Sequence, residues 1–425
     1  MTRKLQGFAL FLAGVVLAGS PAWAANGHLL HGVGAVNSAM GGAGVALPND
    51  ALGALNLNPA LLTQLDGSKF EFSAEYNDAK NALESSVQTP FGTFSGRTED
   101  KGDRSVIPAF GFTVHKPQAP VAFGVGFLGL AGFGVDYPQD ATNPLLAPQP
   151  RGFGRVYSNY QLLKIPVTVA IQVSPNLSLG ASFNAAHATL TADPAGFATP
   201  DCAGPNNCVF PRVNNDSAFG WGLGVGLLYK VTPTLNLGLS YTTKTDFQDF
   251  VWNTTVANTS LPTYGTARKV KFKLDAPPIL VGGLGWRPTG RVSIALDGKW
   301  INYEKTDGFK DTLGFKDMKV VALGLQFEAT PTIILRVGGN HGNSPIDSSN
   351  VFQSVPVPAV FENRITAGFG QKVTDSLTLN LGYYHVFKNR VSGPFVSPVI
   401  GPVPGTRVTT EMAMDAVVAT FSFSL

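Results

Sequence analysis

The segment Phe219–Tyr241, FGWGLGVGLLYKVTPTLNLGLSY, contains two runs of alternating residues joined by the short break Thr232-Pro233-Thr234. In the first run, bulky apolar residues occupy every second position and mostly glycine occupies the positions between them. A period of two is typical of a β-strand, whose successive side chains point to opposite faces. Proline rarely continues a central strand, so the break predicts a tight turn. The segment therefore predicts a β-hairpin with one bulky apolar face and one face of small residues.

The same alternation recurs on both sides of this hairpin and predicts fourteen strands. The expected strands are Lys69–Asn77, Ser105–Lys116, Val121–Leu130, Asn159–Val173, Leu177–Leu190, Ser217–Val231, Leu235–Gln248, Ile279–Arg287, Val292–Tyr303, Asp317–Ala329, Ile333–Gly342, Arg364–Val373, Leu377–Arg390 and Thr409–Leu425. Several of them are longer than the roughly 9–11 residues that a tilted strand needs to cross a bilayer.

The links between these strands alternate strictly between short and long. The short links are 117–120, 174–176, 232–234, 288–291, 330–332 and 374–376, and the links between them are much longer. Outer-membrane barrels have short periplasmic turns and long extracellular loops. The pattern therefore predicts an all-β membrane protein, a 14-stranded antiparallel transmembrane β-barrel with both chain ends on the periplasmic side.

The composition also favours a membrane barrel. Charged residues make up only 14% of the chain, whereas soluble domains carry about 25%. Bulky residues on one strand face and small or polar residues on the other suit lipid outside and a lumen inside. Five aromatic residues near strand ends are expected in interfacial girdles: Trp221, Tyr229, Tyr241, Trp286 and Trp300. A net charge of +3 gives no reason to expect a nucleic-acid partner.

The N-terminus has the three parts of a secretory signal peptide. Arg3 and Lys4 precede an apolar stretch, Phe8–Ala18, which is followed by the small-x-small sequence Ala22-Trp23-Ala24. The apolar stretch is about half of the roughly 20 residues that a spanning helix needs. Residues 1–24 are therefore predicted to be removed, so that the mature chain begins at Ala25.

The run Asn26–Leu65 differs from the rest of the mature chain. It is rich in Gly, Ala and Leu, is nearly uncharged, and shows no sustained period of two. Eight strands already fill a barrel with their own side chains and sixteen leave a water-filled channel, so fourteen strands leave space for a plug. We expect residues 25–66 to form a small N-terminal hatch inside a barrel made of residues 67–425.

The only two cysteines, Cys202 and Cys208, lie in one polar segment of a chain expected to be exported. Cysteines in exported proteins usually form disulfides, and this spacing suits a small closed loop. A structural zinc site needs four ligands, and no histidine lies near this pair. The sequence therefore predicts a disulfide and no metal site.

The hatch segment resembles that of a known family. Its Met40-Gly41-Gly42-Ala43-Gly44, Asn49-Asp50, Asn56 and Asn58-Pro59-Ala60 are similar to the hatch of the FadL-type long-chain fatty acid and hydrocarbon transporters. Further similar stretches are Leu177–Leu190, Phe219–Tyr241, Ser344-Pro345-Ile346 and Glu362-Asn363-Arg364. The resemblance implies a plugged fourteen-stranded barrel in the bacterial outer membrane, which binds hydrophobic substrates from outside and releases them sideways through a kinked third strand.

The resemblance also implies where a substrate binds. It places the mature N-terminus, Ala25, Asn26, Gly27 and His28, beside the ligand, and its movement would couple binding to release. Gly129 and Gly132 in the third strand are candidates for the lateral opening, because glycine inside a strand marks bulges and breaks in pairing. The alternative is that these small residues only pack against the hatch.

Two further sets of residues are candidates for substrate contacts. Leu145 and Leu146, with Phe153 nearby, are expected to form a first landing site in the loop after the third strand. The alternation directs Lys164, Lys299 and Arg336, and also Lys244, into the lumen, where a cation could meet a carboxylate. The alternative partners of these cations are carboxylates of the protein itself, such as Asp297 and Asp50.

The sequence favours a transporter over an enzyme. Its Gly32-Val33-Gly34 lacks the third glycine of a dinucleotide-binding motif, and no nucleophile elbow accompanies its histidines. The predicted function is uptake of hydrophobic small molecules, most simply long-chain fatty acids. Aromatic hydrocarbons or alkanes are the main alternative, followed by a non-specific porin and an adhesive surface barrel. We expect no cofactor, contact with outer-membrane lipid and lipopolysaccharide, and a monomer.

Overall fold

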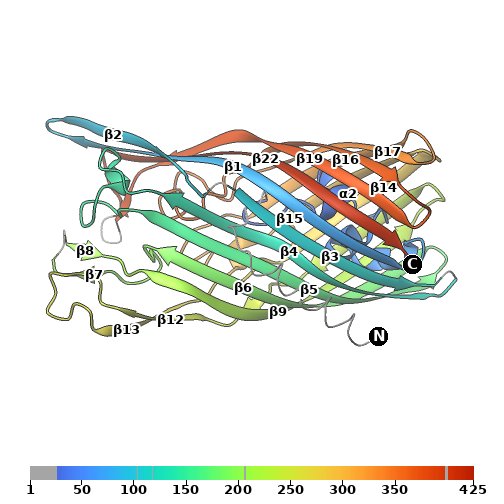
Figure 1. Cartoon of the computed structure of the whole chain (residues 1–425), viewed down its shortest axis with the longest axis horizontal. Coiled ribbons are helices and arrows are strands. Elements are labelled where there is room, and N and C mark those ends of the chain that lie inside the picture. The colour runs from blue at the N-terminus through green and yellow to red at the C-terminus, as the bar shows by residue number, and fades with distance from the viewer. Residues whose placement is uncertain (1–25, 103, 117, 205–206, 398–400) are drawn as a thin grey trace.

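The computed structural model describes residues 26–102, 104–116, 118–204, 207–397 and 401–425. Within these residues, fourteen antiparallel strands form a barrel that closes where the last strand pairs with the first (Figure 1). The barrel strands are β1 (Lys69–Thr89), β3 (Arg104–His115), β4 (Val121–Tyr137), β5 (Val156–Ser174), β6 (Leu177–Asp193), β9 (Val213–Lys230), β10 (Leu235–Thr242), β14 (Ile279–Thr289), β15 (Val292–Ile301), β16 (Met318–Glu328), β17 (Ile333–Gly342), β18 (Asn363–Lys372), β19 (Leu377–Gly393) and β22 (Thr406–Ser424). The predicted fold class is confirmed.

The short turns and the C-terminus lie at one end of the barrel, and the long loops extend from the other end (Figure 1). At the short-turn end, Leu425 N–H donates to Ser68 O at 3.0 Å, so the C-terminus is tied to the start of β1. Large apolar side chains on the outward positions of the strands are exposed, as a lipid-facing surface requires. The five expected girdle aromatics are all between 41% and 55% exposed.

Three strand predictions were wrong in extent by six residues or more. The third strand was expected to end at Leu130, but β4 continues to Tyr137. The first strand was expected to end at Asn77, but β1 continues to Thr89 and pairs with β2 (Gly92–Glu99) in a hairpin that projects beyond the barrel (Figure 1). Beyond Asn77 the outward face of β1 no longer meets lipid and carries polar residues such as Lys80 and Glu84, so apolar alternation no longer marks the strand although its inner face stays buried. The strand expected to reach Gln248 is interrupted after Thr242, and β11 (Asp246–Phe247) resumes the pairing with β9.

The hatch, residues 26–65, lies inside the barrel, where α2 is visible behind the strands (Figure 1). It contains α2 (Gly34–Ala39), α3 (Ala51–Leu57) and the 3-10 helix η1 (Pro59–Gln64). Helices this short are not stable alone in water, so contacts with the wall hold them. For example, Asp297 on β15 accepts hydrogen bonds from the backbone N–H groups of Gly44 and Val45 at 2.8 and 2.9 Å.

Asn58 is the corner of the hatch and is completely buried. Its Oδ1 accepts from Ala60 N–H at 3.0 Å, which caps η1. Its Nδ2 donates to Val45 O within the hatch at 2.8 Å and to Leu227 O of the wall at 3.1 Å. A Cβ on Gly226 would overlap Asn58 Oδ1, so the wall approaches this corner only because residue 226 is glycine.

The long loops carry small elements of their own. These are η2 (Pro144–Leu146), β7 (Asp201–Cys202), β8 (Cys208–Val209), β12 (Phe250–Thr255), β13 (Ala267–Phe272), η3 (Tyr303–Lys305), β20 (Val396–Ser397) and β21 (Gly401–Pro402). A disulfide joins Cys202 to Cys208 across β7 and β8. In the part of the chain that the structure describes, no helix has the length and apolarity needed to cross a membrane.

Candidate functional site

β4 separates from β3 part-way along the barrel wall. Their pairing ends at Ala109 and Leu128, although β3 continues beside β1 as far as Arg104. The ladder between β4 and β5 has a bulge between Gly129 and Ala131. Residues 131–135 are all buried, so the alternation of inward and outward side chains is lost there. We name the unpaired β3-facing edge of β4, residues 129–135, the pairing gap.

Hydrogen bonds close the pairing gap at its extracellular end, and β3 and β4 approach each other closely at its periplasmic end. At its upper end, Lys101 N–H donates to Asp136 O at 3.0 Å, and Asp136 N–H donates to Asp100 Oδ1 at 2.7 Å. At its lower end, a Cβ on Gly129 would lie 2.5 Å from Ile107 Cγ2. Glycine at residue 129 thus allows β4 to pass close to β3 before it turns inward.

The first residues of the hatch occupy the free edge of β4 in the pairing gap. Leu30 N–H donates to Leu130 O at 2.9 Å, and Gly132 N–H donates to His28 O at 3.0 Å. Leu29 lies opposite Ala131 as in an antiparallel ladder. The segment 28–30 therefore replaces β3 as the partner of β4, and its departure would expose backbone groups that need another partner.

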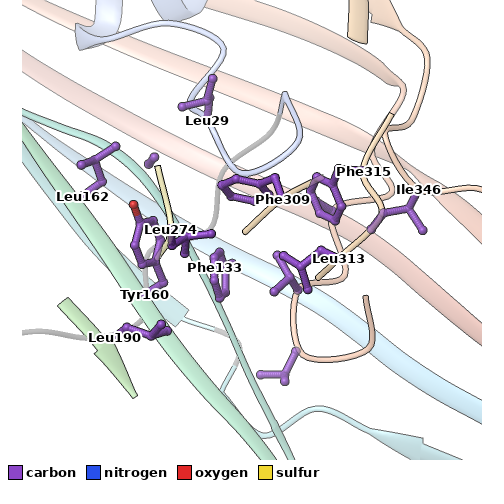
Figure 2. Packing of buried hydrophobic residues seen from close by; sticks show 14 of the residues in the cluster. Leu29, Phe133, Tyr160, Leu162, Leu190, Leu274, Phe309, Leu313, Phe315 and Ile346 are labelled. Carbon is purple, nitrogen blue, oxygen red and sulfur yellow. The ribbon is translucent and has the colours of Figure 1, made fainter. Parts of the chain in front are cut away.

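The same segment is held from the other side by a cluster of aromatic side chains, the gate cluster, which consists of His28, Tyr160, Tyr303, Phe309 and Phe315. The His28 ring stacks on Phe309 with 4.3 Å between ring centroids. The Tyr303 hydroxyl lies 2.9 Å from His28 Nδ1, accepts from His28 N–H at 3.2 Å and donates to Asn26 O at 3.2 Å. Figure 2 shows Tyr160, Phe309 and Phe315 in the same cluster of buried side chains as the hatch residue Leu29.

Gly27 lies against the Tyr303 hydroxyl. Its φ of +67° lies in the left-handed region that favours glycine. A Cβ at this position would overlap the Tyr303 hydroxyl. The hydrogen bonds of Tyr303 to residues 26 and 28 therefore depend on glycine between them.

An inner cavity of about 70 Å³ lies below the gate cluster. Hatch residues, including Asn26, Leu29 and Asn56, form one wall of it, and β-strand side chains form the other. Two cations of the barrel wall, Lys164 and Lys299, line this cavity and are each only 7% exposed. The cavity is otherwise mostly apolar.

Both of these lysines have neutral hydrogen-bond partners. Lys164 Nζ donates to Asn56 Oδ1 at 2.8 Å, and Lys299 Nζ donates to His31 O at 3.0 Å. Among the described residues, neither lysine has a carboxylate within ion-pair distance; Asp297, considered as a partner from the sequence, binds the hatch backbone instead. Two buried lysines therefore face one small cavity and neither forms an ion pair, although Asp297 is near enough to Lys299 to attract it electrostatically.

An outer cavity of about 400 Å³ lies above the gate cluster, among the extracellular loops. Six phenylalanines line it: Phe133, Phe153, Phe197, Phe210, Phe272 and Phe352. In the described part of the chain no charged side chain lines it. Phe133 also stacks on Tyr160 with 4.9 Å between ring centroids, so the outer cavity reaches the gate cluster directly.

The structure brings together some of the residues predicted from the sequence and separates others. Asn26, Gly27 and His28 lie at the gate cluster, whereas Ala25 lies outside the described residues, as does the predicted signal peptide. Phe153 lines the outer cavity, but Leu145 and Leu146 do not; they are buried beneath the β1–β2 hairpin, where Leu145 N–H donates to Ser85 Oγ.

Two cations that the sequence directed into the lumen lie away from the inner cavity. Arg336 donates to Gln326 Oε1 at 2.8 Å and to Asn380 Oδ1 at 3.0 Å, and it lines neither cavity. Lys244 pairs with Asp275 and Asp307 at 2.6 and 2.8 Å. Arg364, which was not considered as a lumenal cation, donates to Asn26 Oδ1 at 3.3 Å.

The family model described as "Outer membrane protein transport protein (OMPP1/FadL/TodX)" matches residues 15–425. The chain belongs to this family. Its members are outer-membrane channels for hydrophobic substrates, so the membrane location and the substrate class predicted from the sequence are confirmed at that level. Among curated protein sequences, no match is found.

Solved structures of this FadL/TodX fold superimpose on nearly the whole chain. The P. putida toluene transporter TodX has 18% identity and a TM-score of 0.66, with 93% of this chain and 99% of that chain covered. A Pseudomonas aeruginosa FadL homologue has 15% identity and a TM-score of 0.72, with coverage of 94% and 99%. The Ralstonia pickettii toluene transporter TbuX has 17% identity and a TM-score of 0.66, with coverage of 93% and 99%. At these identities the likeness shows the fold alone.

The FadL/TodX resemblance and the strand pattern did not identify every residue of the site. Tyr160 and Tyr303 were assigned only to strands, and Phe309 and Phe315 belong to a loop without periodicity. The aromatic content of the segment 303–315 is the one signal that could have marked it, because four large aromatic or aliphatic residues in a polar loop are unusual.

Proposed function

We propose that the channel takes up long-chain fatty acids and that Lys164 and Lys299 bind the carboxylate. The observation that carries this proposal is the pair of buried lysines that line the inner cavity and donate only to neutral hydrogen-bond acceptors. A buried ammonium group without a counter-ion loses hydration that a neutral hydrogen bond replaces only in part. A carboxylate between the two lysines would supply charge-assisted hydrogen bonds, and an acyl chain would suit the apolar walls.

The inner cavity is too small for a whole ligand in the structure described. Its volume of about 70 Å³ corresponds to roughly five water-sized spheres. An acyl chain therefore has to displace the hatch segment 26–31 that forms one wall. Binding is then coupled to movement of the N-terminus, because the ligand favours the displaced state over the closed one.

The proposed path has three steps. A hydrophobic molecule first enters the phenylalanine-lined outer cavity, where its binding follows the apolar area that it buries. Displacement of His28 from the gate cluster then connects the outer cavity to the inner one. Because segment 28–30 also pairs with β4, the same movement uncovers the pairing gap, through which the molecule leaves sideways into the membrane.

The proposal includes the organisation of the chain. Residues 1–24 act as the signal peptide, residues 25–66 form the moving hatch, and residues 67–425 form the barrel. The channel acts as a monomer, since the path runs through one barrel.

Competition binding to the purified protein tests the substrate class. Oleate is expected to displace a fluorescent fatty acid, and Lys164→Met and Lys299→Met are each expected to weaken oleate binding about tenfold or more, as loss of a charge-assisted hydrogen bond predicts. Lys372→Met, which removes an exposed lysine at the periplasmic end, is the matched control. Unchanged oleate affinity in both lumenal variants would exclude this carboxylate site.

Uptake of monoaromatic hydrocarbons is the second candidate function. It is favoured by the uncharged, phenylalanine-lined outer cavity, and the structurally similar TodX and TbuX are toluene transporters by description. A hydrocarbon needs no cation, so toluene binding should be insensitive to Lys164→Met and Lys299→Met. If toluene competes for binding and oleate does not, this second function is the correct one.

A further inference from the structure

A polar pocket of about 490 Å³, which we name the rim pocket, shares no lining residue with the hatch or with either cavity. The strands β1, β2, β19 and β22 form it near the base of the projecting hairpin. Among the described residues, its lining contains three arginines, Arg97, Arg390 and Arg407, and one carboxylate, Glu84. The lining therefore carries a net charge of +2 (three minus one). The transport path proposed above does not use this pocket.

The charges of the rim pocket are only partly satisfied within the protein. Arg97 and Arg390 share Glu84, at 2.7 and 2.6 Å, and also contact Glu411. Glu411 is in addition paired with Lys388 at 2.9 Å. Two carboxylates, Glu84 and Glu411, are thus shared by three cations, and Arg407 adds a fourth.

Arg407 is the unpaired member of the cluster. Its Nη2 donates to Ser392 Oγ at 3.2 Å, and no carboxylate lies within ion-pair distance among the described residues. It lies opposite Ser86 across the strand ladder, and Ser86 lies opposite Ser95 of β2. Two serine hydroxyls and a free guanidinium group therefore share one side of the pocket, a set that suits an anion with several oxygen atoms.

The rim pocket faces outward, toward the surrounding membrane surface and away from the lumen. On β1, Tyr76 is an exposed outward residue, and Glu84 and Ser86 follow it at even intervals and thus on the same face. Glu71 and Asn77, at odd positions, are buried on the inner face. A solute that passes through the lumen would therefore not meet the arginines.

The height of the pocket matches the headgroup layer of the outer leaflet. On the outward face of β1 the apolar surface ends at Tyr76, and Asp78 is the first charged residue above it. Glu84 follows six residues later, which is about 20 Å along the strand and about 15 Å in height for a strand tilted by about 40°. Anions at this height on the outward face belong to the sugar headgroups of the lipids around the barrel.

We propose that the rim pocket binds a phosphate group on the sugar headgroup of the outer-leaflet lipopolysaccharide. Arg407 and Arg390 would hold the phosphate oxygens through paired N–H donors, and Ser86 and Ser95 would complete the contacts. Binding there fixes the β1–β2 hairpin against the surrounding lipid layer.

The test measures binding of lipopolysaccharide to the full-length protein in detergent, without any transport substrate. Phosphorylated lipopolysaccharide is expected to bind the native protein, and Arg407→Gln is expected to weaken it about tenfold or more, as loss of a charge-assisted bond predicts. Ser95→Glu, which adds a carboxylate and removes no arginine, is expected to weaken it similarly. Arg291→Gln, at an exposed periplasmic turn, is the matched control and should leave the affinity unchanged.

Three results would overturn the proposal. The first is equal weakening by Arg407→Gln and Arg291→Gln, which would show general attraction to a positive protein. The second is equal affinity for enzymatically dephosphorylated lipopolysaccharide. The third is that inorganic pyrophosphate binds as tightly as phosphorylated lipopolysaccharide, which would show that the pocket binds soluble anions. The heat-modifiable migration of each variant in gels reports whether the barrel has folded, and oleate binding, measured separately, tests the transport proposal independently.

Discussion

Replacement of Tyr303 by phenylalanine tests how firmly the gate cluster holds the N-terminal end of the hatch. The substitution keeps the ring against Phe309 and Phe315 and removes only the hydroxyl. That hydroxyl takes part in three hydrogen bonds, to the backbone N–H and Nδ1 of His28 and to Asn26 O. One hydroxyl can satisfy all three when Nδ1 carries the proton, because it has one donor and two acceptor sites.

The expected magnitude follows from these contacts. Loss of a typical hydrogen bond costs about 1 kcal/mol, and a buried N–H left unsatisfied costs about 1–3 kcal/mol. The closed position of segment 26–30 should therefore be destabilised by about 2–4 kcal/mol. At about 1.4 kcal/mol per factor of ten, its opening equilibrium rises roughly 30-fold to 1,000-fold.

Hydrogen–deuterium exchange of the hatch amides measures this opening. The Leu30 amide donates to Leu130 O in the closed state, so its exchange rate should rise by about the same factor. Tyr160→Phe is the matched control, because the buried Tyr160 hydroxyl has no hydrogen-bond partner among the residues that the structure describes, and its loss should leave exchange nearly unchanged. Equal exchange of Leu30 in Tyr303→Phe and in the native protein would refute the assigned role of the hydroxyl.

Two other substitutions test the hatch corner and the lateral exit. Asn58→Ala removes three hydrogen bonds, which together contribute about 3 kcal/mol. It should increase ion conductance in planar bilayers while the barrel stays folded, whereas Asn176→Ala, at an exposed turn, should not. Equal conductance of the two variants would show that Asn58 does not hold the hatch in place. Gly129→Leu places a side chain against Ile107 and should slow uptake at least tenfold while ligand binding is retained. Gly290→Leu, whose side chain meets open space, should transport normally. Undiminished uptake by the Gly129→Leu variant would show that the lateral exit lies elsewhere.

The barrel was predictable from the sequence because the membrane imposes a strict pattern on it. A lipid-facing wall requires bulky apolar side chains on alternate positions, and the six short turns divide that pattern into strands of the right length. The same rule failed for β1 beyond Asn77, because the outward face of the projecting hairpin no longer meets lipid and carries polar residues. It also failed after Thr242, where the chain leaves the wall and an unbroken strand was expected.

The site was predictable only in part. Alternation directed Lys164 and Lys299 into the lumen, where they line the inner cavity, and the glycines near residue 129 indicated a break in pairing. The pattern did not indicate that residues 28–30 pair with β4 at this break. That contact and the aromatic partners from the segment 303–315 arise from tertiary packing of irregular chain, which carries no periodic signal.

The central claim is that segment 28–30 must leave β4 for a substrate to pass. Leu29 and Ala131 face each other between two backbone hydrogen bonds, and facing residues at such a position are close enough for a disulfide. The pair Leu29→Cys and Ala131→Cys, in a chain whose native cysteines are replaced by serine, should lock the segment in place when it is oxidised.

Uptake of oleate by cells carrying this locked channel, measured before and after addition of a reductant, tests the claim most directly. We predict that the oxidised channel transports at background level and that reduction restores uptake, while the serine background without the new pair transports equally in both conditions. Undiminished uptake through the fully oxidised channel would contradict the claim.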